Sequence, residues 1–510
     1  MATILFGQND RKFGFSTNNT VRRIESILKT RHRLLQVPAY DASSEDGIQT
    51  WISQNGLGAD LYVGSNYQVL RQLRELGWKG RVLWIAHGDL PHGASGLRSA
   101  LPFLWMTDVI WVASHADKMT YESLVAQNGA QPKVALMPYG VDCNAYSPLT
   151  ETDRQSLRQE WGIVPEEFVV VYTGRISAAK NVHSAVEALH YLSLLGPKVK
   201  FLIAGTFDNR AVRESHFWVT DPRKKMQCLI EHFGLTDRVR FVGWVDQERL
   251  NELYNVGDVF INLTLDIGEN FGNTQVEAMS AGLPVVGTAW GGLKDTIVEE
   301  QTGFLADTWV SEYGVRFDMP KVINVLKMLM DQPAFRNKIG TYASQRAREQ
   351  YSLDMYSDRL LELIDTLVSS TSRESRARFT NFGSSLHSRF TIVDDYTGDR
   401  LAGAPIFSRL SDPHWTELIA PYTSLGWIEP GSGNHLFTAL RGRTESEFYY
   451  STDLLWPVRI RTDAEDAKVI QQLSRYPGLN RGSLDCSDDV ICKLVRKGLV
   501  GISRWDPTDC

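Results

Sequence analysis

The chain has 510 residues, of which 43% are hydrophobic and 10% aromatic, so it can bury large cores and is too long for a single one. Its formal net charge of -6 and its pI of about 6.0 argue against a protein that binds polyanions over its whole surface. The five cysteines are scattered without C-x-x-C spacing, which predicts neither a metal site nor a disulfide framework.

The start of the chain favours a soluble, cytoplasmic protein. Residues 3–7 form a strand-length apolar run that polar residues follow at once, without the longer apolar core of a signal peptide. No uncharged apolar run reaches about 18 residues, so we expect no transmembrane helix. Residues 1–40 carry seven basic and two acidic residues, an excess that suits either an anionic acceptor or surface or simply a solvated helix face.

Residues 1–150 are predicted to form a Rossmann-like α/β domain. It starts with a strand at 3–7 and a helix over 18–35. Further buried strands are expected in the apolar runs 59–64, 82–86, 109–114 and 134–137. Ligands of such sheets lie beyond the carboxyl ends of the strands, and His87 directly follows one of these runs. His87 is therefore a candidate for chemistry, with a structural role as the alternative.

Residues 151–370 are predicted to form a second Rossmann-like domain. The β-branched run 168–172 is typical of a strand buried on both faces of a parallel sheet, and a helix with one apolar face follows from Val182. Arg175 and Lys180 therefore lie on a strand-to-helix loop. Two cations there would neutralise a diphosphate and stabilise it as a leaving group, although ordinary surface charge is the alternative. The runs 199–205 and 239–245 are two more expected strands.

The stretch 268–292 is predicted to be a loop, a short helix, a tight stop, a buried strand and a second glycine loop. Thr274 is the expected cap of the helix, and Gly282 is the expected left-handed stop. The helix N-terminus offers unpaired N–H groups that suit a diphosphate. Glu269 and Glu277 could accept hydrogen bonds from the hydroxyls of a sugar and a ribose. The alternatives are an ordinary loop acid at Glu269 and a capping box between Glu277 and Thr274.

These motifs resemble the donor-site signature of the retaining GT-B glycosyltransferases of the GT4 type. The resemblance rests on the following residues: Gly268-Glu269-Asn270-Phe271-Gly272, Glu277 to Val286, Gly291-Gly292, the pair Arg175-x4-Lys180, and Pro138 to Asp142. It covers residues about 80–370. It implies an α/β GT-B fold in which two Rossmann-like doubly wound domains face a cleft. It also implies transfer of a sugar from a nucleoside diphosphate sugar, with UDP or GDP, to an acceptor hydroxyl, with same-face attack and without a metal or cofactor.

The resemblance assigns roles to single residues. It implies contacts between His87 and the transferred sugar near the reacting centre, and a catalytic and donor-binding role for Glu269. The other donor-binding residues that it implies are Arg175, Lys180, Asn270, Phe271, Gly272, Asn273, Glu277, Gly243, Trp244 and Val245, the last three against the base. The glycine pair that GT4 enzymes commonly carry after the first strand is missing, since Gly7 and Gly14 lie apart. The acceptor side is therefore less defined than the donor side.

Residues 376–510 lie outside the resemblance, behind a polar boundary at 369–376. Their apolar content predicts a folded α+β accessory domain whose end, a helix from Ser487 and a strand at 499–502, is winged-helix-like in outline. Lys493, Arg496 and Lys497 could contact nucleic acid or simply complement the helix dipole. We expect this extension either to help recognise the acceptor, or to pack along the two domains or join subunits. His387, Asp394, Asp395, His414 and His435 show no metal-ligand spacing.

Two other functions stay open at this point. A phosphorylase or epimerase-like enzyme would use the same fold, and a non-catalytic protein could bind a partner through the extension. The set of His87, Arg175, Lys180, Glu269 and Glu277 argues against a decayed site. The sequence leaves open the sugar, the base, the acceptor and the oligomeric state.

Overall fold

The computed structural model describes most of the chain. The described residues are 1–7, 15–38, 45–86, 97, 99–127, 132–177, 180–196, 198–207, 222–266, 268–311, 314–369, 420–425, 435–438, 442–445, 448–451, 459–475, 479–480, 483–484 and 486–503. His87 and the predicted boundary at 370–376 lie outside them. The chain forms two compact units, the first from Met1–Val141, Ile267–Asn273 and Gln350–Asp394, and the second from Asp142–Asp266, Thr274–Glu349 and Asp395–Cys510.

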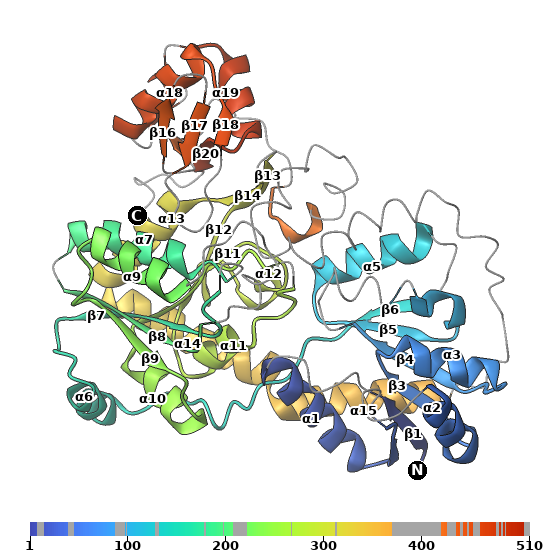
Figure 1. Ribbon diagram of the computed structural model, residues 1–510. Coiled ribbons are helices and arrows are strands. Elements are labelled where there is room, and N and C mark those ends of the chain that lie inside the picture. Colours follow the sequence, from blue (N-terminus) through green and yellow to red (C-terminus); the bar gives the residue numbers. More distant parts are fainter. Residues whose placement is uncertain are drawn as a thin grey trace. The chain divides into compact units, whose positions relative to one another are not determined.

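The first unit is built on a six-stranded parallel sheet with the strand order β2-β1-β3-β4-β5-β6 (Figure 1). Its strands are β1 (Thr3–Gly7), β2 (Arg33–Gln36), β3 (Leu61–Gly64), β4 (Arg81–Ile85), β5 (Val109–Val112) and β6 (Lys133–Leu136). Its helices are α1 (Phe15–Lys29), α2 (Glu45–Trp51), α3 (Tyr67–Glu75), α5 (His115–Gln127) and α15 (Leu353–Ser369). The central strands β3 and β5 are buried throughout, which confirms the reading of these apolar runs as strands covered on both faces.

The predicted helix over 18–35 is wrong at its end. Helix α1 stops at Lys29, and Arg33–Gln36 form the edge strand β2, which pairs with β1 in parallel. The backbone groups of β1 need a partner on this side, and Leu34 and Leu35 are half-buried there. Pairing in the sheet therefore overrides the continuation of the helix.

Helix α15 belongs to the first unit, although it follows the helices of the second unit in the chain. The Val141 amide donates to the Tyr351 carbonyl at 2.7 Å just before α15, and Arg31 after α1 pairs with Asp365 of α15 at 2.7 Å. Lys29 also pairs with Glu25, and Arg23 donates to the Gly140 carbonyl at 2.9 Å. Part of the positive charge in residues 1–40 therefore has partners inside this unit.

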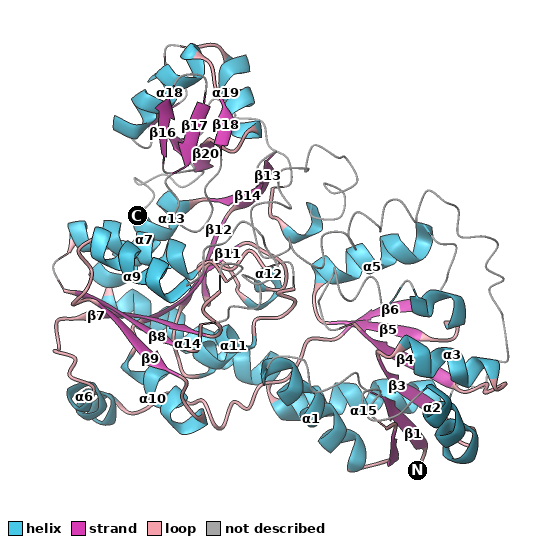
Figure 2. Ribbon diagram, viewed as in Figure 1, coloured by secondary structure: helices cyan, strands magenta, loops and turns pink. Residues whose placement is uncertain are grey.

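The second unit has its own six-stranded parallel sheet, in the order β12-β11-β10-β7-β8-β9. Its strands are β7 (Phe168–Thr173), β8 (Val199–Ala204), β9 (Val239–Gly243), β10 (Val259–Asn262), β11 (Val285–Thr288) and β12 (Gly303–Ala306), beside the hairpin of β13 (Thr308–Ser311) and β14 (Gly314–Phe317). Its helices are α6 (Glu151–Glu160), α7 (Val182–Leu195), α9 (Pro222–His232), α10 (Gln247–Val256), α11 (Asn273–Ser280), α12 (Leu293–Thr296), α13 (Met319–Asp331) and α14 (Pro333–Tyr351). Figure 2 shows helices and strands alternating through this unit.

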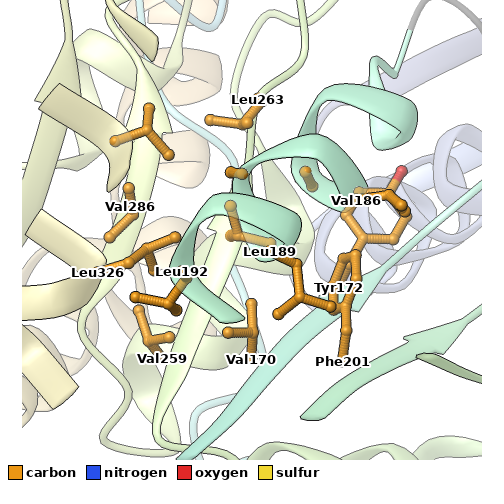
Figure 3. Close-up of a cluster of buried hydrophobic side chains, with 14 of the residues drawn as sticks. Val170, Tyr172, Val186, Leu189, Leu192, Phe201, Val259, Leu263, Val286 and Leu326 are labelled. Carbon is orange, nitrogen blue, oxygen red and sulfur yellow. The ribbon is translucent and has the colours of Figure 1, made fainter. Parts of the chain in front are cut away.

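The core of the second unit forms where α7 packs on the sheet (Figure 3). Val186, Leu189 and Leu192 of α7 are fully buried against Val170 of β7 and Phe201 of β8. This apolar face is the one that the spacing after Val182 predicts. This packing fixes α7 on the sheet, so the loop before α7 runs between two fixed elements, β7 and α7.

Three neighbouring strands of this sheet end in glycines with positive φ. These are Gly174 (φ 137°) after β7, Gly205 (φ 142°) after β8 and Gly243 (φ 84°) at the end of β9. The Gly205 amide donates to the Gly243 carbonyl at 2.7 Å, and a Cβ on Gly205 would lie only 1.8 Å from the Gly174 carbonyl oxygen. At the carboxyl edge of the sheet, the backbones of Gly174 and Gly205 therefore lie too close together for a side chain on Gly205, which requires glycine at this position.

The described parts of residues 376–510 form two small sheets and two helices. β15 (His435–Thr438) pairs antiparallel with β19 (Leu479–Asn480) and β20 (Val500–Ser503), and β17 (Phe448–Ser451) pairs with β16 (Gly442–Glu445) and β18 (Arg459–Arg461). Helix α18 (Ala464–Arg475) and helix α19 (Asp488–Arg496) share a core with β15 and β20. An α+β extension is thus confirmed, although β20 pairs with the distant β15 instead of a neighbouring hairpin strand.

The basic residues at the end of α19 have acidic partners within the extension. Lys493 pairs with Asp466 at 2.6 Å and with Asp463 at 2.8 Å, and Lys497 pairs with Asp466 at 3.2 Å. The carboxylates of Asp463 and Asp466 therefore offset two of the cations that could have contacted nucleic acid. In the part of the chain that the structure describes, no helix is long and apolar enough to cross a membrane.

We predict that Gly205→Ala lowers the stability of the second unit by about 2 to 5 kcal/mol, because the new Cβ meets the Gly174 carbonyl and the backbone has a positive φ. Gly234→Ala is the matched control, since Gly234 also has a positive φ (65°) but open space around its Cβ position. It should cost about 1 to 2 kcal/mol. Denaturant unfolding measures both, and equal losses would contradict the close approach as the reason for Gly205.

Candidate functional site

The loop from β7 to α7 carries Arg175 and Lys180 and is held from both sides. The Tyr172 hydroxyl donates to the Arg175 carbonyl at 2.8 Å, while the Arg175 side chain is exposed. Asn181, which is buried with a left-handed backbone (φ 54°), donates from Nδ2 to the Leu263 carbonyl at 2.9 Å. The two cations therefore start from a backbone that the sheet holds in place.

Lys180 has a partner that the sequence analysis missed. Its Nζ lies 3.0 Å from Oδ2 of Asp266, and both side chains are largely buried, with 15% and 21% of their surface exposed. Asp266 follows β10, the neighbour of β7 in the sheet. A signal for the pair existed, because loops after adjacent parallel strands emerge at the same edge.

Helix α11 begins at Asn273, two residues before Gln275, which is the first helical residue that a cap at Thr274 predicts, so Thr274 lies in its first turn and not at its cap. The reason lies in Gly272, whose positive φ (81°) ends the preceding loop directly before Asn273. The predicted stop at Gly282 (φ 87°) and the buried strand β11 are confirmed. The helix N-terminus thus lies in the predicted stretch but begins two residues earlier than a cap at Thr274 predicts.

A buried set of polar side chains fixes α11 against the ends of β10 and β11. Gln275 donates from Nε2 to the Thr296 hydroxyl and accepts from Asn262 Nδ2 at 3.5 Å. Asn262 Oδ1 accepts from the Thr264 amide at 3.3 Å, and the Thr288 hydroxyl donates to the Thr264 carbonyl at 2.6 Å. All five residues are buried. Sequence reasoning missed this network, because single polar residues in apolar surroundings give no periodic signal.

Glu277 is buried, with only 9% of its surface exposed, and its carboxylate faces Tyr254. The Tyr254 hydroxyl lies 3.1 Å from Glu277 Oε2, 3.2 Å from the Thr274 carbonyl and 2.9 Å from the Thr173 hydroxyl. Burial, followed by the negative charge of Glu277, raises the pKa of Tyr254 well above its ordinary value. The neutral tyrosine therefore remains available as a donor that orients this carboxylate.

The loop 268–273 lies in the first unit, where Phe271 is its anchor. The Phe271 ring is 2% exposed and packs edge-on against Tyr139 at 5.9 Å and against Tyr351 at 5.5 Å. Burial raises the pKa of Tyr139, and a hydrogen bond with the Asn270 side chain partly offsets this rise. Phe271 thus has a packing role, while the half-buried Glu269 and Asn270 keep their donor-binding roles as predictions.

The remaining predicted residues divide into two groups. Gly243, Trp244 and Val245 follow β9 at the same edge as Arg175, and the Trp244 side chain is 64% exposed. Their contact with a base stays a prediction.

His87 lies outside the described residues, as do four of the residues weighed for a metal, His387, Asp394, Asp395 and His414. Among the side chains that the structure describes, no three His, Cys, Asp or Glu residues lie close enough together to hold a metal ion.

Comparison with known proteins identifies a family for part of the chain. The model of the family "Glycosyl transferases group 1" matches residues 153–313. A D-inositol 3-phosphate glycosyltransferase of Mycobacteroides abscessus is 30% identical over 192 residues, which are 38% of this chain and 40% of the relative. A mannosylfructose-phosphate synthase of Agrobacterium fabrum is 26% identical over 243 residues, 48% of this chain and 50% of the relative. The chain thus spans about half the length of these curated relatives.

Solved structures show the same fold at low sequence identity. The sucrose-phosphate synthase of Thermosynechococcus elongatus is 17% identical with a TM-score of 0.55, and the match covers 72% of this chain and 99% of that one. The Anabaena protein Alr3699/HepE, solved in complex with UDP, is 19% identical with a TM-score of 0.57, and the match covers 71% and 100%. Together with the two parallel sheets, these likenesses confirm the GT-B fold. Residues 153–313 are thus similar to the glycosyl transferases group 1 family, whose model they match.

Proposed function

We propose that the protein is a retaining glycosyltransferase that moves a sugar from a nucleoside diphosphate sugar to an acceptor hydroxyl. The observation that carries this proposal lies at the carboxyl edge of the second sheet, where Arg175 and Lys180 follow β7 and the Tyr254 hydroxyl connects Thr173, the last residue of β7, to the buried carboxylate of Glu277 in α11. Arg175, Lys180 and the N-terminus of α11 suit a diphosphate, and the carboxylate of Glu277 suits a ribose diol. The family of residues 153–313 supports this reading.

In the proposed step, the bond between the anomeric carbon and the phosphate oxygen breaks, and the acceptor oxygen forms the new bond on the same face. The departing nucleoside diphosphate takes the electron pair, and its phosphate accepts the proton of the acceptor hydroxyl. Arg175 and Lys180 stabilise the negative charge that develops on the leaving group. This charge stabilisation is also our reason to propose that the reaction needs no metal.

The donor and acceptor belong to the proposal as chemical classes. UDP is our first choice of nucleotide, because Alr3699/HepE was solved with UDP and with UDP-glucose; GDP is the second. An anionic acceptor agrees with the names of the two relatives, which include a phosphate, and with the basic residues 1–40. We expect release of the nucleoside diphosphate, whereas a phosphorylase would consume or release inorganic phosphate. A cytoplasmic location stays a prediction from the sequence.

We predict that Arg175→Ala and Lys180→Ala each weaken nucleoside diphosphate binding about 10- to 100-fold, since each removes a charge-assisted hydrogen bond. Calorimetric titration with UDP, GDP and ADP measures this effect. Lys327→Ala is the control, because Lys327 is an exposed lysine of α13 that pairs only locally, with Asp331. Unchanged affinity in both site variants would remove them from the phosphate site.

Glu269→Gln and Glu277→Gln should separate the two carboxylates. We expect Glu269→Gln to lower turnover while the affinity for free nucleotide stays near wild type, because we assign Glu269 to the sugar. Glu277→Gln should lower both the turnover and the affinity for free nucleotide, because we assign Glu277 to the ribose. Titration together with initial rates tests this difference. A Glu277→Gln protein that only melts at a lower temperature would instead favour a purely structural role, in which Glu277 fixes α11 through Tyr254.

Tyr254→Phe tests whether the orientation of Glu277 matters. The change removes the hydroxyl that faces Glu277 and Thr173 but keeps the buried ring, so we expect nucleotide affinity to fall about three- to tenfold. In a Glu277→Gln background the same change should have a smaller effect, because the carboxylate that Tyr254 orients is gone. Equal losses of affinity in both backgrounds would show that Tyr254 acts on binding independently of Glu277 and would contradict the orienting role.

A further inference from the structure

A short piece of the C-terminal extension, segment 420–425, packs against the glycine loop that follows β11. Tyr422 is fully buried, and its ring lies 5.7 Å from that of Trp290. The Gly291 amide donates to the Tyr422 carbonyl at 2.8 Å. This segment lies outside the recognised family motifs, yet it contacts the Gly291-Gly292 pair that belongs to them.

Lys294 holds the backbone of the same segment. Its Nζ donates to the Pro421 carbonyl at 2.6 Å and to the Thr423 carbonyl at 2.8 Å. Burial lowers the pKa of Lys294. Lys294 lies in the first turn of α12, directly after the Gly291-Gly292 pair, so residues 289–294 (loop 289–294 below) are bound to the segment through Gly291 and again through Lys294.

The far end of the segment is attached to Thr308, the first residue of β13. The Leu425 amide donates to the Thr308 carbonyl at 3.0 Å, and the Thr308 amide donates to the Ser424 hydroxyl at 2.9 Å. The Thr308 hydroxyl in turn donates to the Ala289 carbonyl at 2.6 Å. Segment 420–425 therefore has contacts on both sides of loop 289–294.

Loop 289–294 connects directly to the partner of Lys180. Trp290, which is 1% exposed, donates from Nε1 to the Asp266 carbonyl at 2.8 Å, and the Asp266 carboxylate pairs with Lys180 at 3.0 Å. All these residues belong to the second unit. An unbroken series of contacts thus runs from Tyr422 through Trp290 and Asp266 to the proposed phosphate-binding lysine.

We propose that segment 420–425 positions the donor site: it fixes loop 289–294, so that Trp290 holds Asp266 where the carboxylate orients Lys180 toward the donor phosphates. This inference rests on the proposed function. Its physical reason is that two consecutive glycines leave the loop many conformations, and contacts that remove this freedom before the ligand arrives lower the entropic cost of binding. Tyr422 and Trp290 are positioning residues and do not contact the donor.

The test is a double-mutant cycle read by calorimetric titration of the full-length protein with UDP, or with GDP or ADP if the wild type prefers one of these. Tyr422→Ala should weaken nucleotide binding about three- to tenfold in the wild-type background and have little effect in a Lys180→Ala background. In donor kinetics, the KM for the nucleotide sugar should rise while kcat changes less. Trp290→Phe keeps the ring beside Tyr422 but removes the hydrogen bond to Asp266, so it should give the same result and serves alone if Tyr422→Ala does not fold.

Arg316→Ala is the matched control for a general loss of docking. Arg316 donates from Nε to the Gly498 carbonyl at 2.9 Å, so its removal cuts a different contact between the extension and the second unit. It should lower the melting temperature with unchanged nucleotide affinity. Two results would overturn the positioning role but not the proposed function. One is an equal loss of nucleotide affinity in Arg316→Ala. The other is a loss of affinity from Tyr422→Ala and Trp290→Phe that persists in the Lys180→Ala background. A wild-type protein that binds none of the three nucleotides would instead overturn the proposed function and this inference with it.

Discussion

The ion pair between Lys180 and Asp266 is the interaction on which the second unit's candidate site depends. It joins the loops that follow two adjacent strands, β7 and β10, at the carboxyl edge of the sheet. An exposed pair of this kind contributes little, but this one is partly buried, Trp290 donates to the Asp266 carbonyl, and Asn181, next to Lys180, donates to the Leu263 carbonyl. The charge of Lys180 is therefore held in position and is partly neutralised by Asp266.

Buried polar contacts hold the neighbouring helix α11 in place in the same way. A helix of eight residues has little stability of its own, so its position depends on what it packs against. Gln275 and Glu277 bind it to the strand ends and to Tyr254. Each of these buried groups would be costly without its partner, which makes the arrangement specific as well as stable.

The C-terminal extension is less separate than its sequence suggests. Its polar boundary and its own small core indicate an independent accessory domain, and the core of β15, β20, α18 and α19 agrees with that view. Segment 420–425 and the contact of Arg316 with Gly498 nevertheless join it to the second unit. In the described residues the extension therefore contacts the rest of the second unit, while acceptor recognition and the joining of subunits stay predictions.

The sequence by itself determined the two Rossmann-like sheets, the extension as a folded α+β part and the local motifs, because apolar periodicity, glycine stops and the Arg175-x4-Lys180 spacing are properties of neighbouring residues. It missed the end of α1, where pairing with β1 creates β2. Only the tertiary structure decided the partners of the site residues: Asp266 for Lys180, Tyr254 for Glu277, and Tyr422 for Trp290. The two residues of each pair are 23 to 132 positions apart in the sequence. No local sequence pattern encodes such a contact, because it forms only when the folded sheet brings the ends of its strands together.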